Sequence, residues 1–147
     1  GGLLLAYAFF QSAFDMINVD YGYTVLRAAT ARAVVAAGLH PSIGLHHSHD
    51  NNAMRLVDDL MEPFRPVVDW TVWQLQHNQP CHINPDTKRA LVKSLYLDLA
   101  TPVGNTPVLV AVQKLATSLA QVLTNERTAL DLPHPCVPTA HVQDMRD

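Results

Sequence analysis

The stretch YGYTVLRAATARAVVAA, residues 21–37, decides the fold class of this chain. It is rich in alanine, which has the best helix propensity, and it contains no proline. Small residues recur at helical spacing and form one stripe, namely Val25, Ala29, Ala33 and Ala36. We therefore expect a helix that packs closely against its neighbours. Gly38 ends this helix, and Pro41 prevents it from continuing.

Helical periodicity extends on both sides of this stretch. The apolar residues 3–14 predict a buried helix, and four more helices are expected over 52–61, 66–76, 86–97 and 108–123. In the helix that Pro66 opens, the inward residues are expected to be Val67, Trp70, Trp73 and Gln74. Asp86 is the expected N-cap of the next helix. The class is therefore mainly α, with a bundle-like arrangement.

Turn residues separate these helices. Residues 78–85 and 101–105 are predicted to be loops, because proline and glycine interrupt them. Thr106 is the expected cap of the last helix, with Pro107 at its first position. No segment alternates long enough to predict a strand. We expect one helical domain over residues 1–133, followed by an irregular proline-rich tail over 134–147.

Composition limits the classes of function. The 147 residues fit one domain, and 10 basic against 13 acidic residues give a net charge of −3. Any nucleic-acid binding must therefore depend on a local patch, a metal or a partner. Cys81 and Cys136 lack metal or disulfide spacing, which favours free thiols in a reducing cytoplasm. The run GGLLLAYAFF is too short to cross a membrane, and a start within a helix suggests that further chain precedes it.

A second stretch, GLHHSHDNNAMRLVDDLMEPFRP (44–66), concentrates groups that bind metals and exchange protons. On a helix, Asp58 and Asp59 would lie near Glu62, and their mutual repulsion needs compensation. A divalent cation can compensate, and so can Arg55 or Arg65. Solvated acidic faces are common, so the cluster alone does not decide between these readings.

The histidines before this helix leave several alternatives open. If the segment is extended, His46 and His47 point to opposite sides, so only one of them faces the acids. A histidine with carboxylates favours manganese or zinc and still admits magnesium. A zinc site built from His46, His47, His49 and Asp50 is a weaker alternative. Pro63 ends the acidic helix just after Glu62 and brings Arg65 near, where it can pair with the acids or hold a phosphate.

The motifs DYGYTVLRAATARAVVAAGLHPSIGLHH (20–47) and LVDDLMEPFRP (56–66) resemble the CRISPR-associated integrase that captures foreign DNA spacers, most of all its type II form. The resemblance implies the helical C-terminal domain, with the N-terminal β domain absent from this chain. It also implies an endonuclease and integrase that depends on Mg2+ or Mn2+, in which a 3′-hydroxyl of captured DNA attacks the CRISPR repeat.

The resemblance assigns the site to particular residues. His47 and Glu62 would hold the metal, and Asp59 would lie beside it. The implied partners are double-stranded DNA, both captured spacer and CRISPR repeat, a second copy of the chain in a homodimer, and the small second CRISPR-associated protein. Candidate phosphate contacts are Arg55, Arg65, Lys88 and Arg89, whereas Arg27 and Arg32 suit either DNA contact or packing.

The family's third metal ligand has no counterpart in this sequence. It is a glutamate upstream of the Tyr-Gly-Tyr motif, and the chain holds only two glutamates, Glu62 and Glu126. We therefore expect this chain alone to be an incomplete and inactive fragment. The alternative is a helical DNA-binding or assembly module without catalysis.

Overall fold

The computed structural model describes residues 2–41, 54–78, 83–101 and 104–133, with side chains from residue 16 onward except 77 and 78. Within these ranges helices dominate, and the strands form a single two-stranded hairpin. The mainly α class is confirmed. Cys81, Cys136 and the tail 134–147 lie outside the described residues, so their predictions remain untested. Among the described residues no helix is both long and apolar enough to cross a membrane.

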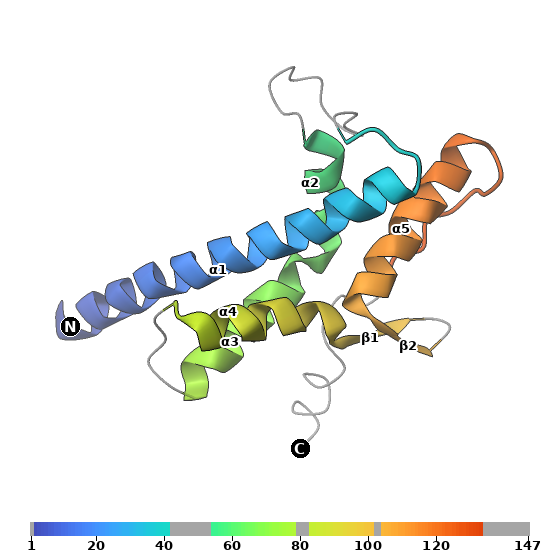
Figure 1. The fold of residues 1–147 in the computed structure, drawn as a ribbon. Helices are drawn as coiled ribbons and strands as arrows, with labels where there is room; N and C mark the ends of the chain where they lie inside the picture. Colours follow the sequence, from blue (N-terminus) through green and yellow to red (C-terminus); the bar gives the residue numbers. More distant parts are fainter. Residues whose placement is uncertain (1, 42–53, 79–82, 102–103, 134–147) are drawn as a thin grey trace.

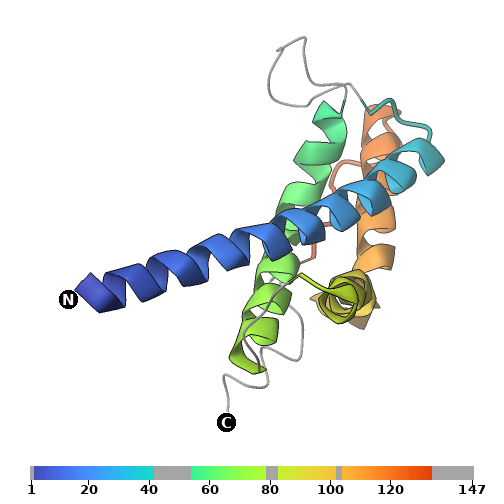
Figure 2. The same ribbon diagram turned by 60° about the vertical axis from the view of Figure 1, so that its left-hand side comes forward.

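Helix α1 (Gly2–Ala36) is the longest element and runs across the other helices (Figures 1 and 2). The predicted break between residues 14 and 21 was wrong, because neither proline nor glycine interrupts residues 15–20. The N-terminal half of α1 extends beyond the rest of the fold in both views. Gly38, at φ +80°, ends the helix as predicted, and the Leu39 N–H donates back to the Val34 carbonyl.

The second part of the chain forms a nearly continuous helical run. Helix α2 (Arg55–Met61) leads through the 3-10 turn η1 (Glu62–Phe64) into α3 (Arg65–Asn78). The prediction that Trp73 faces inward was wrong, since it is 47% exposed. Val67 is buried as predicted, and Val68 and Val72 fill the other inward positions.

Helix α4 (Pro85–Lys93) is shorter than the prediction for 86–97 and continues into the 3-10 turn η2 (Ser94–Tyr96). Its N-cap is Asn84, not Asp86. The Asn84 Oδ1 accepts hydrogen bonds of 2.9 Å from the N–H groups of Asp86 and Thr87. Pro85 explains the shift, because a proline at the first helical position places the cap one residue before it.

A β-hairpin replaces the loop predicted over 101–105. Strand β1 (Asp98–Thr101) pairs antiparallel with β2 (Gly104–Pro107). The predicted helix cap at Thr106 was therefore wrong, because Thr106 lies buried in β2 opposite Leu99. Pro107 ends the strand and precedes α5 (Val108–Leu123), whose first N–H donates to the Leu97 carbonyl. Four-residue strands are too short to show alternation in sequence.

The core lies where α1 crosses the α2–α3 run, α4 and α5. Fully buried side chains come from each of these helices and from the hairpin, and include Leu26, Val34, Phe64, Val68, Leu91, Leu99 and Leu115. At Gly22, α1 lies in close contact with α3. A Cβ there would lie 2.5 Å from the Val68 Cγ1, so only glycine fits without a shift. This contact fixes the positions of the two tyrosines that flank Gly22.

Candidate functional site

Asp58 in the acidic cluster is held by an arginine from a distant element. Arg27 on α1 places its Nε 2.8 Å from Asp58 Oδ1 and its Nη2 3.1 Å from Asp58 Oδ2. The two side chains are 42% and 30% exposed, so the pair is partly shielded from water. A divalent cation or an arginine was expected to offset the repulsion between these acids, and for Asp58 the structure provides an arginine. This ion pair supports the packing alternative for Arg27, and a DNA contact by Arg27 stays a prediction.

Glu62 is in a different environment. It begins η1 at the end of α2, as predicted, although its backbone keeps α-helical angles (φ −48°, ψ −48°) instead of leaving the α region before Pro63. Its side chain is 60% exposed. Arg65 Nη2 lies 3.3 Å from Glu62 Oε1, longer than a typical charge-assisted hydrogen bond. Asp59, on the preceding turn, is half-buried and has an interaction of its own. An exposed carboxylate with one loose contact is chemically suited to a hard divalent cation.

Tyr23 supports the arginine beside Glu62. The Arg65 Cζ lies 5.1 Å from the centroid of the Tyr23 ring, within cation–π range. The Tyr23 hydroxyl donates a 2.6 Å hydrogen bond to Asp69 Oδ1. Burial, and then this hydrogen bond and the charge of Asp69, raise the pKa of Tyr23 to about 12. The phenol therefore stays neutral and keeps a fixed orientation beneath the guanidinium.

Sequence reasoning missed both Tyr23 and Asp69 as parts of this site. The Tyr-Gly-Tyr motif was noted only for its resemblance to the integrase, and no role was assigned to Asp69. The sequence does not show that these two residues meet, because they lie 46 positions apart and only the tertiary fold brings them into contact. The close approach at Gly22 joins them, and glycine between two aromatic residues is the one local sign of it.

The histidine side of the candidate site lies outside the described residues. This holds for His46, His47, His49 and Asp50, so the convergence of His47 with Glu62 remains a prediction. Across the ranges that the structure describes, no cluster of three or more His, Cys, Asp or Glu side chains could hold a metal ion. A metal centre at Glu62 would therefore need at least one further ligand from outside the described residues, such as His47.

The four candidate phosphate contacts lie on three helices, α2, α3 and α4, each of which packs against α1. Arg55 begins α2 and Arg65 begins α3, both half-buried. On α4, the Lys88 Nζ lies 5.5 Å from the centroid of the Tyr21 ring, and Arg89 forms an exposed 3.3 Å ion pair with Asp86. Their role in binding DNA stays a prediction.

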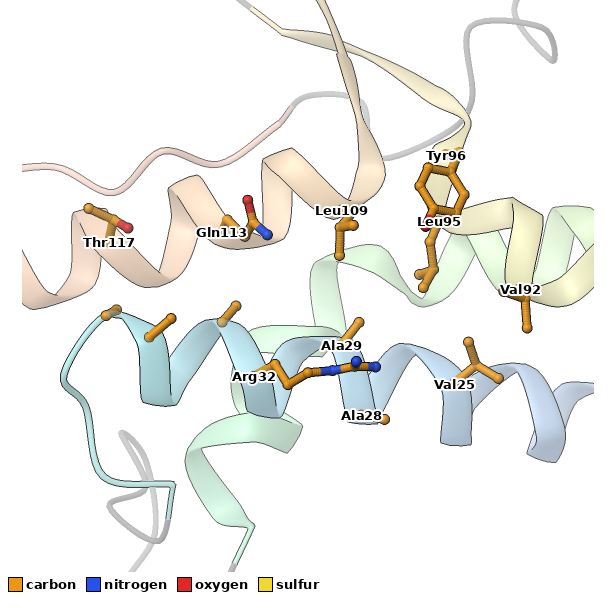
Figure 3. Close-up of a pocket in the computed structure, with 13 residues that line it drawn as sticks. Val25, Ala28, Ala29, Arg32, Val92, Leu95, Tyr96, Leu109, Gln113 and Thr117 are labelled. Carbon is orange, nitrogen blue, oxygen red and sulfur yellow. The ribbon is translucent and has the colours of Figure 1, made fainter.

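A separate groove of about 810 Å³ lies between α1, α5 and η2 (Figure 3). Figure 3 shows Leu109, Gln113 and Thr117 of α5 facing the small-residue stripe of α1 across it. The expected close packing holds for Ala29 and Ala33, which are buried, but Ala36 is exposed. Arg32 is the one charged residue that lines this groove among the described residues. The groove contains none of the predicted metal ligands.

Comparison with known proteins places the chain in a family. The model of the family described as CRISPR associated protein Cas1 matches residues 12–98. The CRISPR-associated endonuclease Cas1 of Neisseria meningitidis serogroup C (strain 8013) is 34% identical over 118 residues, which cover 78% of this chain and 39% of that protein. The CRISPR-associated endonuclease Cas1 1 of Thermus thermophilus is 46% identical over 61 residues, which cover 40% of this chain and 19% of that protein.

A solved structure of a casposase bound to integration product shares the fold. The TM-score is 0.67 at 24% sequence identity, over 80% of this chain and 38% of the casposase chain. At this identity the likeness shows the fold alone. The chain spans less than half the length of the relatives that it matches. Because the family match over residues 12–98 covers more than half of the sequence, the chain belongs to the Cas1 family.

Proposed function

We propose that this chain forms the helical part of a metal-dependent DNA endonuclease and integrase that inserts foreign DNA spacers into a CRISPR array in the prokaryotic cytoplasm. The family match carries this proposal, because residues 12–98 include both His47 and Glu62. The endonuclease names of the relatives support the reaction class. The casposase bound to integration product supports DNA as the substrate.

His47 and Glu62 are the proposed ligands of one Mg2+ or Mn2+ ion. Glu62 suits this role because its carboxylate is exposed at the end of α2. Asp59, one turn before Glu62, is proposed to orient His47 or a water molecule. Asp58 is excluded from the ligand set, because Arg27 binds both of its oxygens.

The chemistry that a divalent cation supplies when bound is polarisation of a phosphoryl oxygen and stabilisation of the charge that develops on it. The protein residues position the reacting groups. Arg65 is 3.3 Å from Glu62 and holds a DNA phosphate next to that carboxylate with its planar fork. The 3′-hydroxyl of captured DNA then attacks a phosphodiester of the repeat. A new P–O bond forms, the P–O bond to the adjoining 3′-oxygen of the repeat strand breaks, and that oxygen leaves as a hydroxyl with the proton that the attacking group loses, so no protein nucleophile is needed. Arg55, Lys88 and Arg89 contact further phosphates.

Catalysis by this chain alone is proposed to be weak or absent. The resemblance requires a third ligand, a glutamate upstream of Tyr21, and the two glutamates of the chain are Glu62 and Glu126. The proposed assembly comprises a second copy of the chain, the small second CRISPR-associated protein and double-stranded DNA. A non-catalytic DNA-binding or assembly module is the second candidate, favoured by that missing glutamate.

Calorimetric titration with Mn2+ separates these two candidates. We expect the wild-type chain to bind Mn2+ and the His47→Ala and Glu62→Gln variants to bind it at least roughly tenfold more weakly, because loss of a residue that only orients a metal ligand already costs about that much. Asp58→Asn is the matched control, because it removes a carboxylate charge four residues away on the same run. Equal binding by wild type and both ligand variants would leave only the non-catalytic candidate.

Metal analysis and salt dependence complete the test. Bound zinc that survives Glu62→Gln but not His49→Ala would favour the alternative zinc site.

DNA affinity should fall steeply with salt and vary little with sequence, because the proposed contacts reach phosphates. Replacing Lys88 and Arg89 together by glutamine should reduce the salt dependence. An affinity that stays constant as salt rises would contradict the DNA proposal.

A further inference from the structure

Arg65 is fixed by Tyr23 and only loosely bound by Glu62. The ring beneath its guanidinium is itself oriented by the 2.6 Å bond to Asp69 and by the close helix contact at Gly22. The contact to Glu62, in contrast, is a single 3.3 Å approach from an exposed carboxylate three residues away. Exposed pairs at this spacing are weak, so Glu62 can turn away while the guanidinium stays.

The pair with Glu62 also leaves the guanidinium incompletely satisfied. The Arg65 Nε is buried and has no hydrogen-bond partner among the groups that the structure describes. Arginine has five N–H donors in a planar fork that matches carboxylate and phosphate oxygens. The side chain is still 37% exposed, so an anion arriving from solvent can reach its outer nitrogens.

The charge of Arg65 has opposite consequences for a cation and for DNA. A divalent cation at Glu62 would lie next to a fixed positive charge that repels it. A DNA phosphate on Arg65 would neutralise that charge and free Glu62 from its counter-ion. Resting on the proposed metal role of Glu62, we propose that Arg65 is a counter-ion shared between Glu62 and a DNA phosphate, so that divalent cation and DNA bind this site cooperatively, with Tyr23 as the support that holds the guanidinium.

Cooperativity of this kind is reciprocal. The factor by which DNA tightens cation binding must equal the factor by which the cation tightens DNA binding. We expect a factor of about five to ten, at the lower end of typical coupling, because the site is partly exposed and salt screens it. An unloaded site would thus bind cations weakly, and DNA would complete it.

The test measures the affinity of the full 147-residue chain for Mn2+, with and without a short double-stranded DNA. Wild type should bind Mn2+ about five- to tenfold more tightly when DNA is present. Arg65→Gln should bind Mn2+ more tightly than wild type without DNA, and DNA should then have no further effect. Glu62→Gln measured with DNA corrects for the Mn2+ that binds to DNA phosphates themselves.

Tyr23 variants examine the support. Tyr23→Phe keeps the ring and should keep most of the coupling, whereas Tyr23→Leu removes the ring and should lose it. Thermal unfolding of both variants identifies a loss caused merely by a disturbed fold. Arg127→Gln is the matched control, because it removes an arginine from an ion pair outside the site and should leave the coupling unchanged.

The outcomes distinguish this proposal from the one on which it rests. If Glu62→Gln binds Mn2+ as wild type does, or if wild type binds none with or without DNA, the metal role of Glu62 fails and the coupling with it. If Glu62 is required but Arg65→Gln keeps the wild-type affinity and DNA effect, only the shared counter-ion is overturned. Loss of coupling in Arg127→Gln would likewise show that general charge, not Arg65, produces it.

Discussion

The carboxylates of Asp58 and Glu62 lie four residues apart on one helical run, and each has an arginine nearby. Arg27 approaches Asp58 from another helix with two contacts of 2.8 and 3.1 Å. Arg65 approaches Glu62 from the next turn with one contact of 3.3 Å. Asp58 is half as exposed as Glu62, at 30% against 60%.

This difference separates a structural carboxylate from one that can take a ligand. The Asp58 pair connects α1 to α2, so breaking it would loosen a contact between elements. The Glu62 pair connects neighbours within one run and adds little to the fold. Both residues are carboxylates on the same helical run, so their types and positions do not distinguish them. Their roles follow from how many contacts each makes with its arginine and from whether that arginine belongs to another helix.

The largest expected effect disrupts the placement of α1, which carries both Arg27, the partner of Asp58, and Tyr23, the support of Arg65. Gly22→Val should destabilise the chain by about 3 kcal/mol, and Gly22→Ala by less, because added carbons collide with Val68. Urea unfolding measures both. Thr24→Ala is the control on the same helix, since its exposed hydroxyl bonds only the Asp20 carbonyl. A Gly22→Val variant as stable as wild type would show that the helices can separate without cost.

The next effect compares the two carboxylates directly. Asp58→Asn should destabilise the chain by about 1 kcal/mol, because it weakens a two-contact pair that is only partly exposed. Glu62→Gln should change stability by less than about 0.5 kcal/mol. Mn2+ binding, in contrast, should be weakened more by Glu62→Gln than by Asp58→Asn. If Glu62→Gln were the more destabilising of the two, the division of roles would be wrong.

The helices were predictable from sequence where a local rule determines them. Gly38 ends α1 because its backbone needs a positive φ. The α-helix α2 also gives way to a 3-10 turn beside Pro63, as predicted, although Glu62 keeps α-helical angles. Errors arose where two local rules compete. Asp86 and Asn84 both suit an N-cap, and Pro85 selects Asn84. The hairpin was missed because its strands are four residues long and owe their pairing to each other rather than to an alternating pattern.

The site was predictable only as a set of residues. The sequence placed Glu62 at a helix end next to Arg65, which the structure confirms. It offered Arg55 and Arg65 as compensators, and Arg65 does pair with Glu62, but Arg27, 31 positions from Asp58, binds that second acid. Likewise nothing local connects Tyr23 to Asp69. Contacts between residues so far apart depend on how helices cross, which the periodicity of one helix does not specify.

A smaller effect concerns the support of Arg65. The pKa of Tyr23 is raised from 10.0 to about 12, first by burial and then by Asp69. A raised folded-state pKa contributes stability that is complete below about pH 10 and is lost as pH rises toward 12. The Tyr23→Phe variant should not lose this stability as pH rises. In a pH titration followed by ultraviolet absorbance, it should also lack the tyrosine ionisation that occurs at the highest pH. An unchanged last step in Tyr23→Phe would mean that another tyrosine carries the high pKa.

The smallest expected effect tests which property of an ion pair determines its contribution to stability. One candidate is the distance between the charged atoms, and the other is the separation of the two partners along the chain. Arg127 binds Asp131 with contacts of 2.8 and 2.9 Å, as short as those of Arg27 to Asp58, but both partners lie near the end of α5. We therefore expect Arg127→Gln to cost less stability than Asp58→Asn in urea unfolding.

The same pair gives this test a pH signature. The hydrogen bond from Arg127 lowers the pKa of Asp131, so the contribution of the pair is present above the unfolded-state pKa and is lost as pH falls through the folded-state value. Arg127→Gln should therefore differ from wild type at neutral pH and approach it in acid. Arg127→Gln and Asp58→Asn could instead lose equal stability. In that case the short contact distances alone would explain the structural role of Asp58, and it would not matter that Arg27 comes from a different helix.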